Sequence, residues 1–192
     1  MNSEVFRPII EKLVRVGVDP ALADCFAHQL HQRRCRSKDV LFAEGDALPD
    51  AFYLLSGYVR LYATDENGNT IEKILAGPRD FVGCVSAILY QRPSELTAEC
   101  ITDCQLVVID QHHQAVVKSD LKTFTFLQDI AIRHLITLIN EKSAMLPLKA
   151  RDRYLYFRER HPLFSAHIPA GIIANYIGVA PQSLSRIKQS MK

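Results

Sequence analysis

The chain has 192 residues, of which 48% are hydrophobic and 23% are charged, a balance typical of a soluble globular protein. No apolar run approaches the roughly 20 residues that a membrane-spanning helix needs, so we expect no association with a membrane. Residues 1–12 mix acidic, basic and apolar side chains, which excludes a secretory signal. We therefore expect a cytoplasmic protein.

The cysteines favour reduced thiols. There are five, an odd number, and no two are spaced as Cys-x-x-Cys. An iron–sulfur site needs several closely spaced cysteines, which Cys25 and Cys35 alone do not supply. Cys100 and Cys104 lie on strand-like sequence, about 13 Å apart by the rise of an extended strand. We expect them to be too distant for a disulfide.

The charge is unevenly distributed. The formal net charge is +2, but residues 149–192 hold eight Lys or Arg against two acidic residues. That segment carries +6, which leaves −4 on residues 1–148. A basic tail on an acidic body favours a polyanion such as nucleic acid as the partner of the tail. A basic face that is merely solvated would look the same.

Two helices are predicted at the start of the chain. Apolar residues recur at helical spacing between residues 4 and 32. Asp19 is the predicted N-cap of the second helix, and Pro20 is its first residue.

Between residues 33 and 110 the apolar period changes to two. Val59, Leu61 and Ala63 alternate with Tyr58, Arg60 and Tyr62, which predicts a strand with one inward face. Residues 65–69 (DENGN) predict a hairpin turn, because Asn-Gly tolerates positive φ at low cost. Further strand-like runs cover residues 40–42, 51–55, 70–75, 96–101 and 104–109, and the region carries glycines at positions 45, 57, 68, 77 and 83. The pattern predicts an antiparallel β-barrel or β-roll, within an α+β fold.

Residues 111–146 return to helical periodicity. Apolar residues including Leu135, Leu138 and Ile139 form a stripe too wide for one buried face. Such a helix needs two apolar partners, and we expect its own roll and the same helix of a second copy, in a coiled-coil-like homodimer. A single core helix in a monomer is the alternative. Pro147 closes the helix. We therefore predict a sensor domain over residues 1–147, with the dimerisation helix at about 111–146, and a tail domain over residues 148–192.

Residues 168–187 have the pattern of a helix-turn-helix. A short helix with a small inward Ala174 is followed by a glycine turn at Gly178, and Pro181 begins a second helix. The second helix exposes side chains that can reach base edges or phosphates in a DNA major groove: Gln182, Ser183, Ser185, Arg186 and Gln189. An ordinary helical hairpin is the alternative interpretation.

Several segments together resemble the Crp-Fnr family of transcription regulators: residues 40–46 (VLFAEGD), 52–61 (FYLLSGYVRL), 77–83 (GPRDFVG), 154–157 (YLYF) and 184–187 (LSRI). The resemblance covers nearly the whole chain. It implies a β-roll sensor of the cyclic-nucleotide-binding type and a homodimer formed through the long helix. It also implies ligand-controlled binding to a palindromic operator in double-stranded DNA, with RNA polymerase as a further candidate partner.

The predicted ligand pocket departs from that of the family's cyclic-nucleotide binders. Those relatives carry Gly-Glu and then Arg-Ser, where the glutamate holds the ribose and the Arg-Ser pair binds the cyclic phosphate. Here a cysteine follows the glycine, and Ser-Glu stands where Arg-Ser is expected. A carboxylate would repel the phosphate, so we expect an unidentified small-molecule effector or a redox signal rather than cyclic AMP. The candidate pocket residues are Gly83, Cys84, Val85, Arg92, Ser94 and Glu95.

The tail also departs from the family. The sequence ends five residues after Ile187, so we expect it to lack the β-hairpin wing on the C-terminal side of the recognition helix. Pro181 stands where relatives often have a base-reading polar residue. Gln182, Ser185 and Arg186 therefore remain the best base-reading candidates by position in the motif.

Other chemistry has less support in the sequence. His28 and His31 have the spacing of a helical metal pair, but no third ligand stands at matching spacing. Residues 40–109 contain no histidine, which argues against a metal-dependent enzyme on the roll. No glycine-rich phosphate loop or Ser-His-Asp arrangement is evident. We expect no catalytic residue, metal or cofactor. The main alternative to a DNA-binding regulator is a ligand-binding or protein-interaction dimer whose tail has lost DNA binding.

Overall fold

The computed structural model describes residues 30–191 and, before them, residues 7, 10, 11, 14, 15, 17–21 and 23; the side chains of residues 117, 123, 126, 127 and 130 are not described. The helices predicted between residues 4 and 32 lie largely outside the described residues. Within them, Pro20 is helical, and Asp19 Oδ1 accepts a hydrogen bond from the Ala21 amide at 2.8 Å. This is the contact expected of the predicted N-cap.

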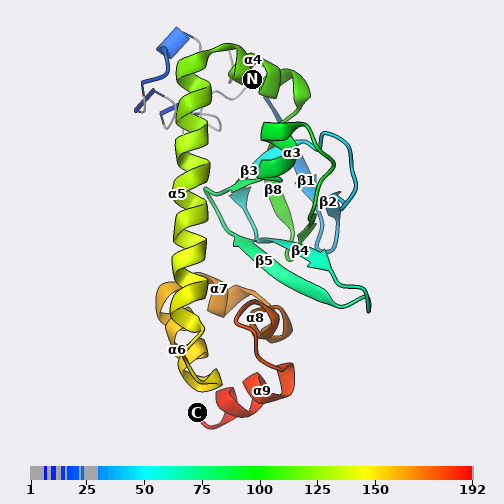
Figure 1. The fold of residues 1–192 in the computed structure, drawn as a ribbon, viewed down its shortest axis with the longest axis vertical. Helices are drawn as coiled ribbons and strands as arrows, with labels where there is room; N and C mark the ends of the chain where they lie inside the picture. Colours follow the sequence, from blue (N-terminus) through cyan, green and yellow to red (C-terminus); the bar gives the residue numbers. More distant parts are fainter. Residues whose placement is uncertain are drawn as a thin grey trace.

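Two four-stranded antiparallel sheets face each other and form the predicted β-roll (Figure 1). Their strand orders are β1-β8-β3-β6 and β2-β7-β4-β5. The strands are β1 His31–Cys35, β2 Val40–Phe42, β3 Ala51–Ser56, β4 Val59–Thr64, β5 Thr70–Ala76, β6 Phe81–Val82, β7 Thr97–Cys100 and β8 Cys104–Ile109. β1 corrects one prediction, because residues 31 and 32 belong to this strand and not to a helix.

The roll core lies between the two sheets. Val59 and Leu61 on β4 are buried there, as their alternation predicted, together with Phe52, Leu54 and Leu106. The predicted hairpin turn is confirmed, since Gly68 has φ +81° and donates its amide to the Asp65 carbonyl at 3.0 Å.

At one end of the roll the chain crosses three times between the sheets. The crossings are residues 36–39, 57–58 and 101–103, which join β1 to β2, β3 to β4 and β7 to β8. Backbone hydrogen bonds tie them together: Lys38 donates to the Cys100 carbonyl at 2.7 Å, and Ile101 donates to the Tyr58 carbonyl at 2.8 Å. The turn at 101–103 brings Cys100 and Cys104 together, and their thiols share a hydrogen bond. The expected separation was wrong, because it assumed one continuous strand.

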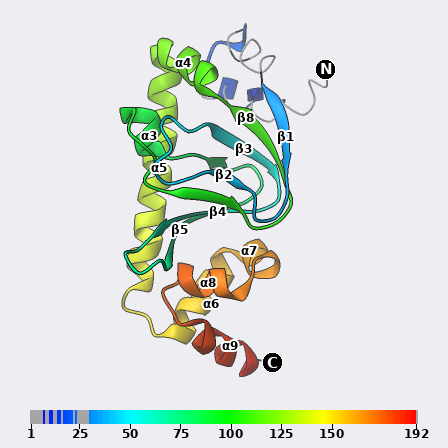
Figure 2. The ribbon, with the colours of Figure 1, turned by 90° about the vertical axis from the view of Figure 1, so that its right-hand side faces the viewer.

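Helices cover the roll and form the tail (Figures 1 and 2). They are α3 Val85–Tyr90, α4 Gln111–Ser119, α5 Leu121–Met145, α6 Ala150–Arg160, α7 Pro162–His167, α8 Ala170–Tyr176 and α9 Pro181–Gln189. The predicted helix over 111–146 is in fact two, because Asp120 has extended ψ 108° and separates α4 from α5. None of the described helices is long and apolar enough to cross a membrane.

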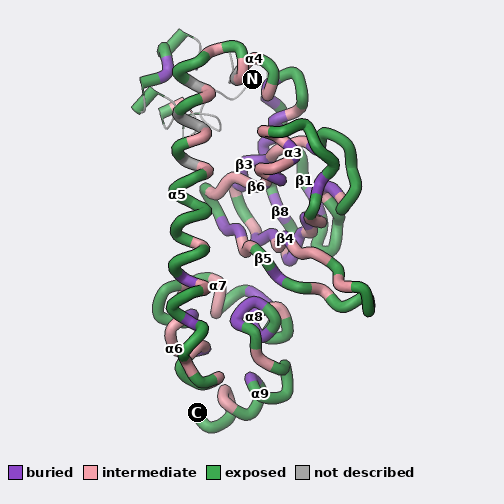
Figure 3. Tube along the Cα trace, in the orientation of Figure 1, coloured by how far each residue is buried: buried purple, intermediate pink, exposed green. Residues whose placement is uncertain are grey.

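α5 runs beside the roll down to the tail, and much of its length is exposed (Figure 3). Its exposed side chains include Ile132, Leu135, Ile136 and Ile139, of which Ile139 is 62% exposed. The wide apolar stripe of the sequence therefore leaves an uncovered face on this helix. We call Ile132, Leu135, Ile136 and Ile139 the α5 apolar face.

Candidate DNA-binding helix and sensor site

The tail contains the helix-turn-helix that the sequence predicts. α8 ends near Ile177, and Gly178 turns the chain with φ +68°. The Val179 amide then donates to the Ala174 carbonyl at 2.9 Å, and Pro181 begins α9. Ala174 is fully buried, so the two helices cross closely where only a small side chain fits.

α9 is amphipathic. Leu184 is fully buried, and Ile187 packs against the tail core. The five predicted DNA-contacting residues are all exposed on the remaining surface of this helix: Gln182, Ser183, Ser185, Arg186 and Gln189. The side chains that could contact a groove are therefore gathered on one short helix at the end of the molecule.

Arg153 holds the helix-turn-helix to the end of α5, a role that the sequence did not predict. Its guanidinium donates to the carbonyls of Leu148 at 2.9 Å and Leu146 at 3.1 Å. It also donates to the carbonyls of Ile177 at 3.4 Å and Gly178 at 3.3 Å. A guanidinium has several N–H donors and can satisfy several carbonyls left unpaired at helix ends. Arg153, although counted in the positive charge of the tail, therefore uses its donors within the fold.

A buried polar network joins α5 to the tail. Glu141 accepts from the Tyr176 hydroxyl at 3.1 Å and lies 2.9 Å from His161 Nε2. Burial raises the pKa of Glu141, but His161, Tyr176 and the nearby Lys142 outweigh burial and hold that pKa below its ordinary value. Burial and the carboxylate of Glu141 raise the pKa of Tyr176. The network therefore keeps Glu141 ionised inside the junction.

Lys142 is the second charged member of this junction. Its ammonium donates to the Tyr176 carbonyl at 2.6 Å and lies 3.3 Å from the centre of the Tyr176 ring. Burial lowers the pKa of Lys142 to about 8, although Glu141 opposes the shift. Lys142 and Glu72 of β5 also attract each other, which links the tail junction to the outer face of the roll.

The roll contributes its own ion cluster to that face. Arg60 Nη1 lies 2.8 Å from Glu72, and Arg60 Nη2 lies 3.0 Å from Glu99. The Glu72 side chain is fully buried, and burial raises its pKa more than Arg60 lowers it. The alternation along β4 predicts its polar face, but no pattern in the sequence predicts this ion cluster.

Apolar contacts complete the junction. Tyr58 and Ile101, from two crossing turns of the roll, share one buried cluster with Met145, Phe157 and the helix-turn-helix core. Tyr58 packs edge-on against Phe164, with ring centres 5.3 Å apart, and its hydroxyl lies 3.3 Å from His167 Nδ1. The tail therefore packs directly on the end of the roll where the chain crosses between sheets.

The candidate ligand-pocket residues surround the start of α3. Gly83 is closely packed, since a Cβ there would lie 2.9 Å from Ile88 Cδ1 and the Ile88 side chain would have to shift. Cys84 is buried, precedes Val85 at the start of α3, and its sulfur lies 3.2 Å from Ser86 Oγ. Cys84 also interacts with Ser94 and with the backbone of Glu95, so the fold brings these positions together.

The remaining pocket candidates differ in exposure. Ser94 is buried and donates its hydroxyl to the Leu96 carbonyl at 2.7 Å, so that group is already satisfied. Arg92 and Glu95 are both exposed. Glu95 therefore lies exposed to solvent beside Ser94, and its effect on a ligand stays a prediction.

Residues 32–117 match the cyclic nucleotide-binding domain family. Solved structures share the fold over most of the chain. A transcriptional regulator of the crp/fnr family from Eubacterium rectale superposes with a TM-score of 0.73 at 14% identity, over 93% of this chain and 85% of that one. FixK2 from Bradyrhizobium japonicum gives 0.72 at 16% identity, over 84% of each chain. The c-di-GMP-responsive global regulator CLP of Xanthomonas campestris gives 0.68 at 18% identity, over 90% of this chain and 91% of that one. A search of curated proteins gave no significant match. The resemblance drawn from the sequence is confirmed at the level of the fold: residues 32–117 match the cyclic nucleotide-binding domain family, and the chain has the fold of these Crp-Fnr regulators.

Proposed function

We propose that this chain is a homodimeric, cytoplasmic transcription regulator of the Crp-Fnr type, which binds double-stranded DNA through α9. The observation that carries the proposal is the exposed polar face of α9 on a helix-turn-helix. Gln182 and Ser185 can donate and accept hydrogen bonds, and Arg186 can pair with a guanine edge or a phosphate. No sulfur, metal or nucleophile chemistry is needed for this role.

The α5 apolar face supplies the dimer. Its four side chains are apolar and at least 40% exposed, which is costly on a helix that remains in water. Packing this face against the same face of a second copy would bury it and relate the two α9 helices by a twofold axis. Paired recognition helices read two half-sites about 34 Å apart, which predicts a palindromic operator.

The surroundings of Cys84 support an effector other than cyclic AMP. A cysteine stands where cyclic-nucleotide binders carry a ribose-binding carboxylate, and the exposed Glu95 would repel a phosphate. The relative CLP responds to cyclic di-GMP, which makes this dinucleotide a second ligand to test beside cyclic AMP. Cyclic AMP and cyclic di-GMP are titrated separately into the purified protein in a calorimeter. We expect no saturable heat of binding with cyclic AMP.

The first experiment selects DNA from a randomised duplex library with the purified protein. We expect enrichment of a palindrome, and we expect its affinity to fall steeply as salt rises, because phosphate contacts release counterions. Arg186→Ala should weaken binding to the selected duplex by about 1–3 kcal/mol, which raises the Kd roughly 5- to 150-fold.

Arg158→Ala is the matched control. Arg158 is an exposed arginine of the same tail, but it lies on α6 and not on α9. Its loss should change the salt dependence slightly and leave the choice of sequence intact. If Arg186→Ala binds the selected duplex as well as the wild type does, α9 is not the reading helix. If the library yields no enriched sequence in the presence or absence of either nucleotide, a ligand-binding or protein-interaction dimer becomes the better account.

A further inference from the structure

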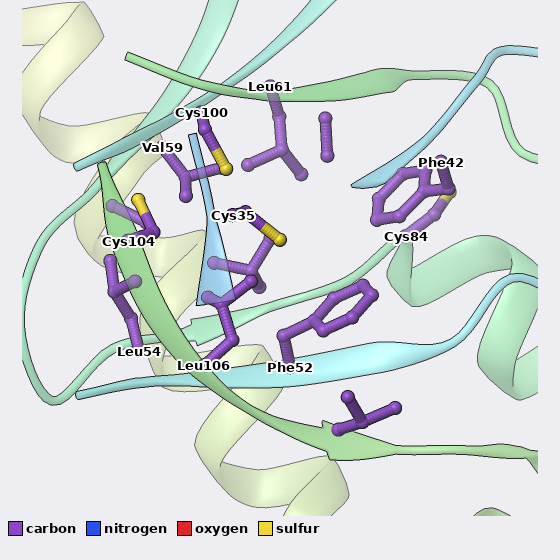
Figure 4. Close-up of a cluster of buried hydrophobic side chains, with 14 of the residues drawn as sticks. Cys35, Phe42, Phe52, Leu54, Val59, Leu61, Cys84, Cys100, Cys104 and Leu106 are labelled. Carbon is purple, nitrogen blue, oxygen red and sulfur yellow. The ribbon is translucent and has the colours of Figure 1, made fainter. Parts of the chain in front are cut away.

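Buried thiols gather at the end of the roll where the chain crosses between sheets. Cys35 ends β1, Cys100 ends β7 and Cys104 begins β8. Cys35 and Cys104 stand directly opposite each other in the antiparallel pair β1–β8. The Cys100 thiol shares hydrogen bonds with both of the others. Figure 4 shows these sulfurs at one end of the core, with Cys84 beside Phe42 at the other end.

A surface cavity reaches this cluster. It has a volume of about 450 Å³ and is lined by Arg34, Cys35, Arg36, Ser56, Asp103, Cys104 and Gln105. Cys35 and Cys104 are thus among the residues that line the cavity, although both are buried, and Cys100 is fully buried beside them. Two arginines against one aspartate make the wall net positive, which favours a thiolate over a neutral thiol.

The thiols of Cys104 and Cys100 are not equivalent. The hydrogen bond from Cys100 lowers the pKa of Cys104 although burial opposes it, while the same bond and burial raise the pKa of Cys100. A thiolate attacks an oxidant, and a neighbouring neutral thiol then resolves the product. Cys104 thus combines a place in the lining of the cavity with the lower pKa of the two thiols.

We propose that Cys104 and Cys100 form a peroxide-reactive thiol pair, in which Cys104 is attacked from the cavity and Cys100 resolves the product as a disulfide. The Cys104 sulfur attacks one oxygen of hydrogen peroxide, the O–O bond breaks, and the departing hydroxide takes up a proton to become water. Cys104 is then a sulfenic acid. The Cys100 sulfur displaces the hydroxyl from Cys104, an S–S bond forms, and a second water leaves. Two thiols lose one electron each, and the peroxide gains both.

Other uses of the cluster have less support. Among residues 30–191 no group of three or more His, Cys, Asp or Glu side chains is arranged to hold a metal ion. Cys84 belongs to the other end of the core, and its sulfur contacts hydroxyl groups. It cannot reach the pair at the cavity, and it serves as the natural control.

The pair lies against the junction with the tail. The Cys104 sulfur lies 3.5 Å from the Tyr58 carbonyl, and Ile101 immediately follows Cys100. Tyr58 and Ile101 are buried in the same cluster as Phe157 of the tail. A disulfide draws the two sulfurs closer than hydrogen-bonded thiols can lie, so the turn at 101–103 must shift, and the tail packs on that turn. Any consequence for DNA affinity rests on the function proposed above, but the thiol chemistry does not.

The test oxidises the folded wild-type protein with hydrogen peroxide, quenches it in acid with an alkylating agent, and maps the cysteines by mass spectrometry. In a sample quenched in acid without the alkylating agent, we expect the intact mass to fall by about 2 Da, the mass of the two hydrogens lost when a disulfide forms. Cleavage before Asp103 separates Cys100 from Cys104 unless they are linked. The linked fragments should appear after oxidation and disappear on reduction. A link from Cys35 to Cys104, or oxidation of Cys84 before the pair, would overturn the assignment.

Variants separate the two roles. Cys100→Ala should leave a Cys104 sulfenic acid, about 16 Da heavier and trapped by a dimedone-type reagent. Cys104→Ala should show neither product at this site, and Cys84→Ala should behave as the wild type does. Hydrogen exchange of α6 and α8 should change on oxidation of the wild type and not of Cys104→Ala. Wild-type protein that shows no loss of mass at any peroxide concentration short of unfolding refutes the proposal, whatever the DNA selection gives.

Discussion

Truncating the α5 apolar face should weaken the dimer by an amount that the structure allows us to estimate. Ile139 is 62% exposed on the described chain. Full burial of an isoleucine side chain contributes about 1.5–3 kcal/mol, so covering its exposed part contributes about 1–2 kcal/mol in each subunit. A twofold dimer contains this contribution of Ile139 twice, and alanine retains part of it because it keeps the Cβ. Ile139→Ala should therefore cost about 1.5–3 kcal/mol of dimer stability, which raises the dimer Kd roughly 10- to 150-fold.

Sedimentation equilibrium over a dilution series measures this change. The matched control is Ile71→Ala, the same truncation of an exposed isoleucine, 45% exposed on β5 and away from α5. We expect the control to leave the dimer Kd within about twofold of the wild type. A wild-type protein that sediments as a monomer at micromolar concentration, or an Ile139→Ala dimer as tight as the wild type, would refute the assignment of the interface to α5.

The remaining predictions concern the roll and its junction with the tail. Gly57→Ala should destabilise the fold by at least about 2 kcal/mol in urea unfolding, because Gly57 has φ +92° and a Cβ there would lie 2.6 Å from Cys104 Sγ; an unchanged midpoint would show that the crossing turn can relax. Tyr176→Phe should cost about 1.5–3 kcal/mol at pH 7, because Glu141 loses a buried hydrogen-bond donor. The pKa of Glu141 is lowered in the fold, so this loss should shrink as the pH falls below 4.5, the ordinary value at which the unfolded carboxyl takes up its proton. The pKa of Lys142 is about 8 in the folded protein and 10.5 in the unfolded chain. Between these two pH values the unfolded chain binds more protons than the folded protein, so the stability of the wild type should increase as the pH rises from about 8 to 10.5. The free energy of unfolding of Lys142→Met should lack this increase when both proteins are unfolded in urea at pH 7.5 and 9.5. If the wild type and Lys142→Met show the same pH dependence, the ammonium of Lys142 is not buried as described.

The features that sequence predicted best are those that local chemistry determines. The helix-turn-helix depends on a glycine turn, a proline at a helix start and a spacing of apolar residues, all within a short stretch. The β4–β5 hairpin likewise follows from Asn67-Gly68 and from alternation on either side of it. In both cases the neighbours in sequence are the neighbours in space, so the pattern carries the structure.

The features that sequence missed depend on contacts between distant segments. Cys100 and Cys104 were expected to be far apart because the three residues between them carry no glycine or proline to mark a turn. The turn is instead held by backbone bonds to Tyr58 and Lys38, from other crossings. The first two residues of β1, His31 and Gln32, were predicted as helix because their partners on β8, Val108 and Val107, are far away in the sequence. Arg153 similarly appeared as free charge, since the carbonyls that it holds come from the end of α5 and from the helix-turn-helix.

The junction suits a regulator whose tail must change position relative to the roll. Its apolar part, around Tyr58, Ile101 and Phe157, fixes the arrangement seen here. Its polar part, with Glu141 and Lys142, can exchange its hydrogen bonds for water at a small net cost, whereas purely apolar packing could not. About 5.5 kcal/mol of differential binding is enough to reverse such an equilibrium from 1:99 to 99:1. Chemistry at Cys104 would act on Tyr58 and Ile101 themselves, so in the regulator that we propose a small movement of one crossing turn is transmitted to the domain that carries α9.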